Sequence, residues 1–577
     1  MFPANAQRIA DGVEAIMKNK HLLLALVIFL LCMTASAAIA ADIDIGFSWT
    51  VEGRTVTVNL TPSSGKHYAL YLPGVCRSEA LTVTVRGRGS VLWGGRLIGT
   101  GDSIDLRNDI GKTVEVNTPD GRQLNLVSVM QGSLIPSVFI ELAPKDIRHI
   151  DEKRTNDIRQ DGLLTVLNND GSLLCTETVT SFHLRGHTTR HALKRPYQMK
   201  LKHKQAIGGM PASKTWLLLA NWYDVSLLRN QITLNLCREM GLKGTPRGMQ
   251  TDVYLNGVYN GVYYLCEKLQ IRSSRLDITD MEKAQDVLNT DPSVRFRLQY
   301  SRKYGVPLLR WHTNIAEPED ITGGFLLELE KKLQFSENVK NGGFITDGDL
   351  CVIINEPTRV GFRAANYIAS LVNDFHNAAI AKDGFSPKTG RYYADFIDMD
   401  SFAAKIIVEE ISCNFDVKAA SQFIYKDADS KNPLLYAGPG WDYDLTYGNK
   451  TQKTQHDPTR LNYVSDRSSA TSNLYGCLLK HDDFARRTRT LFIEKAIPAL
   501  EILLGSRPAP EGSNLRSIDS WADEIRASAR MNFARWSTGL IIDLYKPSGV
   551  TFDDAVAYLK NFILLRKEAL DGGWLVQ

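Results

Sequence analysis

The amino-acid sequence predicts an α+β protein that begins with a small all-β sandwich. Three observations favour this fold class. Short alternating apolar runs fill residues 42–143, strand patterns and one helix pattern follow, and amphipathic helices dominate from Ala364 to the end. A strand-rich half followed by a helix-rich half is typical of α+β proteins.

Length and composition indicate a folded protein with more than one domain. The 577 residues are too many for a single compact core, so we expect at least two domains. The chain is 44% hydrophobic and 23% charged, as folded soluble proteins are. Its net charge of +4 is small for this length, which argues against a nucleic-acid-binding protein held by a broad basic field.

Residues 1–41 have the pattern of an export signal. A basic flank, Lys18 to Lys20, precedes an apolar run and then the small residues Ala-Ser-Ala-Ala-Ile-Ala-Ala, with cleavage expected after Ala37 or Ala40. The alternative is an uncleaved N-terminal membrane anchor, because the apolar stretch is nearly long enough to span a bilayer. Both interpretations export the rest of the chain to the periplasm, the cell surface or the medium. Only the anchor would contact a membrane.

The cysteines do not form a recognisable framework. Apart from Cys32 in the export segment, seven are widely scattered and none belongs to a CxxC pair. This spacing fits neither a zinc site nor a dense disulfide scaffold. We expect most of them to be buried and to behave as apolar residues. One or two disulfides are an alternative, and the sequence does not assign their pairing.

The segment 42–143 contains the runs that predict the sandwich. Among them are FSWTV, TVTVNL, LTVTVRG and TVEVNT, separated by the turn sequences SSGK, RGRG and TPDG. Several short strands at this rhythm are typical of a β-sandwich of about a hundred residues. The segment has no catalytic set, so we interpret it as an accessory or binding module.

The pattern of predicted secondary structure changes near Pro144, where longer strands and a helix begin. VFIEL, LLTVLN, YQMKLK and TWLLLA read as strands, and DVSLLRNQITLNLCREMGL predicts a helix started by Asp224 or Ser226. The dipeptide Asn256-Gly257 predicts a hairpin between two strands. Residues from about 277 to 320 are polar and uneven, as an insertion would be, and GGFLLELEKK is again a strand. Helices make up the last part, residues 481–577.

Two of four local motifs have phosphate-binding chemistry. LRGHTTR, from Leu184 to Arg190, combines a glycine with hydroxyl and backbone donors, which suits a loop over phosphate oxygens, although a plain β-turn has the same composition. Lys200 and Lys202 alternate with apolar residues along the next strand. Either lysine could reach phosphates, or the two could belong to a solvated strand face.

The other two motifs carry carboxylates. Asp416 follows an apolar helix, where it can accept a proton from an attacking hydroxyl or simply cap the helix. In GWDYDLTYG, Asp442 and Asp444 are two hard oxygen donors at a spacing that suits magnesium or manganese carrying a nucleoside triphosphate. An Asp-Tyr-Asp turn that bonds its own backbone is the alternative. The order of the four motifs is the order required for phosphoryl transfer.

Six pieces of the chain resemble one known family. They are LRGHTTRHALKRPYQMKL, WLLLANWYDVSLLRNQITLNL, VYLNGVYNGVYYLCEKL, GGFLLELE, the NFD of CNFD, and GWDYDLTYG. In this order they resemble the spore coat CotH family of atypical, secreted protein kinases. The resemblance runs from about residue 180 to residue 450, and leaves out the N-terminal β module.

The resemblance implies a two-lobed, protein-kinase-like domain over residues 144–480, completed by the helices of 481–577. It also implies an exported enzyme that uses ATP with Mg or Mn to phosphorylate Ser/Thr hydroxyls of a protein substrate. The roles that it implies are catalytic for Asp416 and Lys200, nucleotide-binding for Arg185, Gly186, Thr188, Lys200 and Glu267, and metal-binding for Asp442, Asp444 and Gln422. Glu267 would pair with Lys200 or line the nucleotide pocket, while Asp224 and Arg229 would have structural roles.

The chain departs from the family pattern at two places. The loop usually reads RGNSS, whereas His187, Thr188 and Thr189 stand here, and an asparagine expected about six residues after Asp416 is replaced by Ser421 and Gln422. Two alternatives therefore remain: a weak or inactive kinase-like adhesin or scaffold, and transfer of another group such as AMP or glutamate. The sequence contains no HExxH or GxSxG motif, which argues against metalloprotease and serine-hydrolase chemistry.

Overall fold

The structure is a computed structural model that describes residues 43–87, 89–120, 124–143, 160–186, 189–414, 420–449, 456–462, 473–537 and 550–574. The expected signal peptide or anchor therefore lies outside the described residues, as do Thr188 and Asp416. Within the described ranges, no helix has the length and apolar character needed to cross a membrane. The chain divides into two compact units: one holds the residues up to Ser48, Asn59–Leu70 and Ser78–Val129, and the other holds Trp49–Val58, Tyr71–Arg77 and Met130–Gln577.

The N-terminal region is all-β, as the sequence predicts. It contains two sheets, with strand orders β2-β1-β5-β8 and β3-β4-β10-β9-β6-β7. Buried Phe47 and Trp93 join them edge to face, with ring centroids 5.3 Å apart. The strands are β1 (Asp44–Val51), β2 (Arg54–Asn59), β3 (Thr61–Pro62), β4 (His67–Leu72), β5 (Leu81–Arg86), β6 (Ser90–Trp93), β7 (Arg96–Gly99), β8 (Ser103–Ile104), β9 (Thr113–Asn117) and β10 (Leu124–Gln131).

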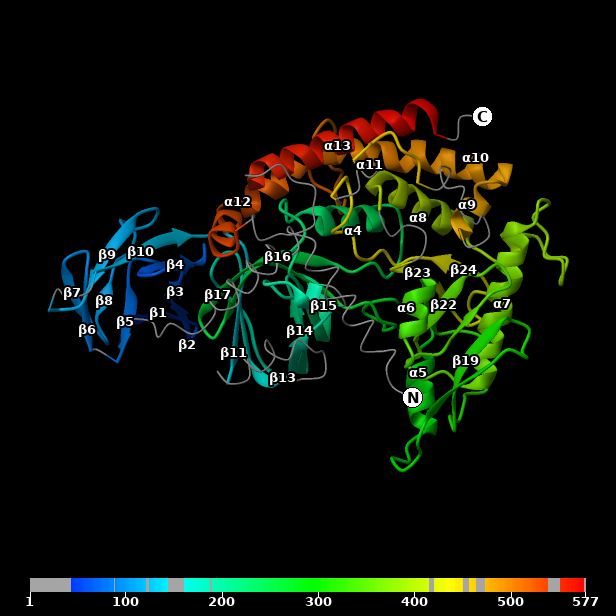
Figure 1. Ribbon diagram of the computed structural model, residues 1–577, viewed down its shortest axis with the longest axis horizontal. Helices are drawn as coiled ribbons and strands as arrows, with labels where there is room; N and C mark the ends of the chain where they lie inside the picture. The colour runs from blue at the N-terminus through cyan, green and yellow to red at the C-terminus, as the bar shows by residue number, and fades with distance from the viewer. Residues whose placement is uncertain are drawn as a thin grey trace, which may run out of the picture. The chain divides into compact units, whose positions relative to one another are not determined.

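The second unit contains a closed barrel (Figure 1). Its strand order is β11-β12-β13-β14-β15-β17-β16, and the parallel pair β11 and β16 closes it. Alternate side chains, such as Tyr197, Met199 and Leu201, fill the interior. The strands are β11 (Ser137–Leu142), β12 (Gln160–Leu167), β13 (Leu173–Leu184), β14 (Tyr197–Ile207), β15 (Met210–Leu219), β16 (Gly248–Leu255) and β17 (Val258–Glu267).

Two local predictions within the barrel region are confirmed. Leu255 pairs with Val258, so Asn256 and Gly257 form the predicted two-residue hairpin. The predicted helix is α4 (Arg229–Glu239), inserted between β15 and β16. Asp224 supports the start of α4 by accepting from the backbone N–H of Arg229 at 2.9 Å, although Leu228 is the N-cap residue.

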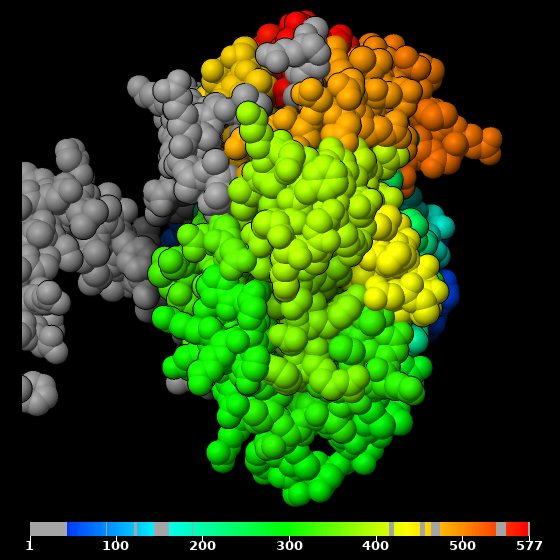
Figure 2. All heavy atoms as spheres, turned by 90° about the vertical axis from the view of Figure 1, so that its right-hand side faces the viewer, coloured from blue at the N-terminus to red at the C-terminus, as the bar shows by residue number. Residues whose placement is uncertain are grey.

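A seven-stranded sheet with the order β18-β19-β21-β22-β20-β23-β24 follows the barrel along the chain. Its strands are β18 (Arg297–Ser301), β19 (Leu308–Thr313), β20 (Phe325–Glu330), β21 (Gly343–Ile345), β22 (Cys351–Glu356), β23 (Gln422–Lys426) and β24 (Leu435–Ala437), and α5 (Met281–Leu288) and α6 (Lys332–Glu337) accompany it. The polar segment 277–320 thus supplies α5 and two strands of this sheet. Figure 2 shows this segment, in green, forming a continuous surface with the yellow-green α7 (Phe362–Ile380).

Helices make up most of the described residues after β22, as predicted, and one large apolar core joins them to the sheet. α8 packs against α4, β24, α10 and α13, so it lies at the centre of this region. Besides α7, the helices are α8 (Met399–Ser412), α9 (Leu474–Leu478), α10 (Asp482–Leu491), the π-helical turn η4 (Phe492–Ala496), α11 (Ile497–Leu504), α12 (Ile518–Arg535) and α13 (Phe552–Gly573). The seven cysteines of the described residues are all buried, and none forms a disulfide with another described residue, in agreement with the apolar role expected for most of them.

A buried polar network attaches α12 to the barrel. Asp252 on β16 is fully buried and accepts hydrogen bonds from Tyr259 Oη at 2.9 Å and from Ser528 Oγ of α12 at 2.7 Å. Lys194 Nζ donates to Asn532 Oδ1 of the same helix at 2.8 Å. Burial raises the pKa of Asp252 to about 7.

The raised pKa of Asp252 predicts a pH-dependent stability. The folded protein keeps a proton on Asp252 up to about pH 7, whereas an unfolded aspartate loses it near pH 4, so the free energy of unfolding falls as the pH rises between these values. An asparagine at position 252 cannot ionise, so Asp252→Asn should make the free energy of unfolding fall less steeply with pH. Urea titrations at pH 4.5 and 6.5 measure it, with Asp523→Asn on the exposed face of α12 as the control. An identical pH dependence in wild type and Asp252→Asn would contradict the prediction.

Candidate functional site

The loop after β24 separates its two aspartates from the tyrosine between them. Tyr443 is fully buried, whereas Asp442 is exposed and Asp444 is half-buried. Asp442 has a backbone φ of 66°, in the left-handed region that costs a residue with a side chain on the order of 1 kcal/mol or more. The loop therefore holds both carboxylates outward by fixing the residue that separates them.

Hydrogen bonds from two helices fix Tyr443. Its hydroxyl donates to Glu409 Oε1 at 2.9 Å and accepts from Lys405 Nζ at 3.1 Å. Lys405 and Glu409, one turn apart on α8, form an ion pair of 2.5 Å with no exposed surface. The backbone N–H of Tyr443 donates to Asn230 Oδ1 on α4 at 2.8 Å. The loop is thus attached to α8 and α4 at one residue.

α4 also holds the far end of the loop. Arg229, which forms a buried ion pair with Asp224, donates from Nε to the carbonyl of Thr446 at 3.0 Å. Thr233 Oγ1 lies 3.0 Å from Tyr447 Oη. Asp224 and Arg229 therefore stabilise the loop that carries Asp442, which agrees with the structural roles expected for them.

Arg185 is a positive charge near the two aspartates, and their charges act on it. Its guanidinium lies over the ring of Trp441, 5.3 Å from the centroid. Burial lowers the pKa of Arg185, and Cys266, Asp442 and Asp444 act in the opposite direction. Its side chain forms no hydrogen bond or ion pair within the described part of the chain, so its N–H donors remain available to a ligand.

Gly186 follows Arg185 in a conformation that favours glycine. Its φ is 82°, and a Cβ added there would lie 2.6 Å from Thr189 Oγ1. The turn after β13 therefore excludes larger residues, as a loop over a ligand would require. Thr188 lies outside the described residues.

Lys200 and Glu267 do not meet. Lys200 is exposed and alternates with buried Met199 and Leu201, so it lies on the outer face of the barrel. Glu267 pairs with Trp216, an interior residue, and accepts from Arg275 Nη1 at 2.6 Å and Arg247 Nη2 at 3.0 Å. The structure gives Glu267 two arginine partners, so pairing with Lys200 does not occur.

Ser421, and not Gln422, lies next to Asp442. Ser421 Oγ is 3.4 Å from Asp442 Oδ2, and Ser421 has a φ of 54°. Gln422 is fully buried, and both of its amide atoms lack a hydrogen-bond partner among the described residues. On β23 it alternates with Phe423 and shares the face of Ile424, which packs in the large core. Gln422 is thus not brought to Asp442.

Glu328 is a neighbour of this group that the sequence did not single out. It accepts from Asn355 Nδ2 at 2.7 Å and from the backbone N–H of Ser421. Burial raises the pKa of Glu328 to about 7, and the charges of Glu330 and Asp442 add to the rise. The alternation in LELE could have indicated acidic side chains on one face, but nothing in it says that this face adjoins Asp442.

The oxygen donors around Asp442 fit a hard divalent cation. The described residues contain no group of three or more His, Cys, Asp or Glu side chains in metal-binding geometry. Mg²⁺ is usually held by one or two carboxylates together with substrate phosphates and water, rather than by a cage of protein ligands. Asp442 with Asp444, and the hydroxyl of Ser421, meet this simpler requirement.

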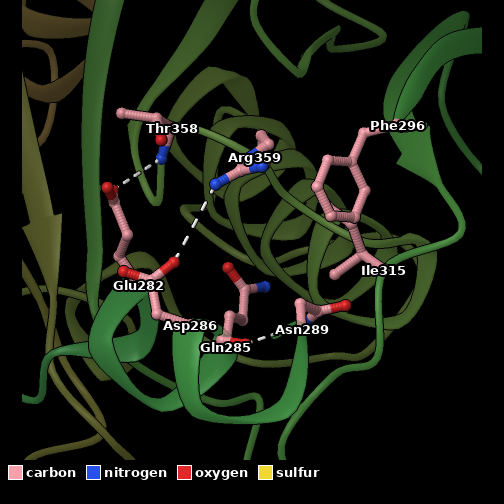
Figure 3. A pocket seen from close by; sticks show the side chains of 8 residues that line it. All are labelled: Glu282, Gln285, Asp286, Asn289, Phe296, Ile315, Thr358 and Arg359. Carbon is pink, nitrogen blue, oxygen red and sulfur yellow. Dashed lines mark hydrogen bonds and ion pairs between the residues drawn. The ribbon is translucent and has the colours of Figure 1, made fainter. Parts of the chain in front are cut away.

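A separate small hollow lies beside α5 (Figure 3). Its polar side chains mostly engage one another or nearby backbone: Glu282 accepts from the backbone N–H of Thr358 at 3.0 Å, and Arg359 lies 3.9 Å from Asp286. Arg359 also covers the ring of Phe296. We therefore place the candidate site at Arg185 and Asp442 and not in this hollow.

The chain belongs to the CotH kinase family. The family model described as CotH kinase protein matches residues 182–570, which is most of the chain and includes the barrel from the end of β13 onward, the sheet and the helices. The match extends beyond the 180–450 range of the sequence resemblance and takes in α9 to α13. A search of curated proteins finds no match.

Removing the hydroxyl of Tyr443 should destabilise the protein. Tyr443→Phe leaves the buried Lys405–Glu409 pair without its third member, and we expect a loss of about 1–3 kcal/mol in the free energy of unfolding. Tyr264→Phe is the matched control, because the equally buried Tyr264 hydroxyl has no hydrogen-bond partner in the part of the chain that the structure describes. Equal stability changes in the two variants, measured by urea denaturation, would show that the Tyr443 hydroxyl has no anchoring role.

Proposed function

We propose that this protein is an exported, ATP-dependent Ser/Thr protein kinase with a two-lobed architecture. The barrel would be the first lobe, and the seven-stranded sheet with its helices the second. The proposal extends the family assignment, which gives a kinase-like protein, to a substrate class, a cofactor and a location. The export pattern of residues 1–41 supports a location in the periplasm, at the cell surface or in the medium.

The observation that carries the proposal is that Arg185 stacks on Trp441, the neighbour of Asp442, and that the charges of Asp442 and Asp444 act on it. The arginine comes from the barrel and the aspartates from the loop after β24, more than 250 residues apart in the sequence. Opposite charges near one another, with the Arg185 donors unused within the described part of the chain, suit a ligand that carries both negative charge and a metal ion. A nucleoside triphosphate with Mg²⁺ or Mn²⁺ is such a ligand.

Each candidate residue would have one role in phosphoryl transfer. Arg185 and the backbone of Gly186 would hold the phosphates, and Lys200 would contact them from the barrel face. Asp442, with Asp444 and Ser421, would hold the metal, which when bound neutralises phosphate charge. Asp416, which lies between α8 and β23, would accept the proton of the acceptor hydroxyl. Positioning and charge neutralisation supply most of the catalysis in phosphoryl transfer.

One observation favours a second function, that of a kinase-like scaffold without turnover. The side chain beside Asp442 is the short hydroxyl of Ser421 in place of an amide, and Gln422 lies elsewhere. A scaffold would keep the fold without transferring phosphate. If ATP and Mg²⁺ do not raise the melting temperature of the protein, the scaffold is favoured. Transfer of AMP or glutamate would use the same fold, and intact-mass measurement of the product separates these groups from phosphate.

Phosphate incorporation tests the proposed activity. The full chain, incubated with labelled ATP and Mg²⁺ or Mn²⁺, should label itself or a casein-like acceptor. Asp416→Asn and Asp442→Asn should each lower the rate by about 100-fold or more, because one removes the base and the other a metal ligand. Asp523→Asn on α12 should leave the rate unchanged.

Two outcomes would overturn the proposal. One is the absence of any labelling by the wild-type chain with either metal. The other is labelling that persists in both Asp416→Asn and Asp442→Asn, since the transfer would then come from a contaminant or from another site.

A further inference from the structure

Lys268 lies level with Lys200 on the barrel wall, with the strand β15 between them. Lys200 pairs with Thr215 on β15, and the pairing of Trp216 with Glu267 puts Thr215 level with Lys268, directly after β17. Neighbouring strands lie about 4.8 Å apart, so the two lysines are separated by roughly 10 Å at the backbone. Two extended lysine side chains can meet one phosphate chain across that distance.

Strand alternation places Lys268 on the same outer face as Lys200 and Arg185. On β17, Leu265 fills the barrel interior, whereas Cys266 packs in the core outside it. Lys268 continues the outward series of Cys266. Arg185 follows the interior residue Leu184 by one position and its charge acts on Cys266, so it belongs to the same face. Three cations from three strands thus share one surface.

The charges around Lys268 connect it to the candidate site. Lys268 is exposed, yet enough protein surrounds its ammonium group that burial lowers its pKa. The carboxylates of Glu356 and Glu282 raise this pKa, and Arg185 and Arg272 lower it. Lys268 is therefore close enough to Arg185 for their charges to interact.

The nearby carboxylates are already engaged with other groups. Glu356 accepts from the backbone N–H of Ile271 at 3.0 Å, and Glu282 is turned to the N–H of Thr358 (Figure 3). Burial raises the pKa of Glu356 to about 7, which weakens its charge near neutral pH. Within the described residues, Lys268 Nζ makes no hydrogen bond and no ion pair, so it is available to a ligand.

We propose that Lys268 is a phosphate-contacting residue of this protein, acting with Lys200 and Arg185 on the polyphosphate of a nucleotide. The inference rests on the proposed function for the identity of the ligand. A lysine ammonium is a compact point charge with three donors, which suits phosphate oxygens that an arginine fork has not taken. The competing explanation is that Lys268 only balances the charges of Glu356 and Glu282.

A series of ligands with increasing numbers of phosphates separates these explanations. Calorimetric titration of the full chain with adenosine, AMP, ADP and ATP, each with Mg²⁺, gives the Kd of each. Lys268→Met should weaken ATP and ADP by about 10-fold to 100-fold, as loss of a charge-assisted contact does, and leave adenosine unchanged. Lys268→Arg keeps the charge and should restore most of the ATP affinity.

Lys204→Met provides the matched control. Lys204 is an exposed lysine on β14, four residues beyond Lys200 and past the point where the pairing with β15 becomes irregular. An equal loss of ATP affinity in Lys204→Met would mean that net charge, and not a local contact, sets the affinity. Unchanged ATP affinity in Lys268→Met, or an equal loss for adenosine, would refute the inference. If the wild-type chain binds no nucleotide, the proposed function itself fails, and this result is distinct from the others.

Discussion

The candidate site depends on the burial of one tyrosine hydroxyl. Tyr443 completes a hydrogen-bonded group with Lys405 and Glu409, and its backbone N–H is held by Asn230. A buried ion pair is costly unless its remaining donors and acceptors form hydrogen bonds. The Tyr443 hydroxyl forms one such bond with each member of the pair. In return, the ion pair fixes the residue between Asp442 and Asp444, so both carboxylates have to face outward.

The same constraint joins the two parts of the second unit. α4 is inserted between barrel strands, and α8 lies among the C-terminal helices, yet both bind the loop that follows β24. Arg229 and Thr233 add contacts from α4 to the far end of this loop. The barrel is therefore linked to the aspartates through a rigid helix, which lets Arg185 approach them from the barrel side.

Groups of opposite charge lie near one another around the site. Arg185 stacks on Trp441, and the charges of both aspartates act on it, while its side chain makes no hydrogen bond or ion pair among the described residues. Glu328 is held by Asn355 and Ser421 beside Asp442, and its raised pKa reflects how much the burial of one more negative charge costs there. Positive φ values at Ser421 and Asp442 indicate that backbone strain is accepted to hold these side chains in place.

The sequence by itself determined the α+β class, the N-terminal β region, the Asn256-Gly257 hairpin, the helix that became α4 and the family, because these follow from local periodicity, turn chemistry and ordered motifs. It also singled out Arg185, Asp442 and Asp444. Only the tertiary structure decided the neighbours: Glu267 meets Arg275 and Arg247, Ser421 rather than Gln422 reaches Asp442, and Lys268 aligns with Lys200. Strand register and helix packing bring distant segments together, and no local pattern encodes which side chains then meet.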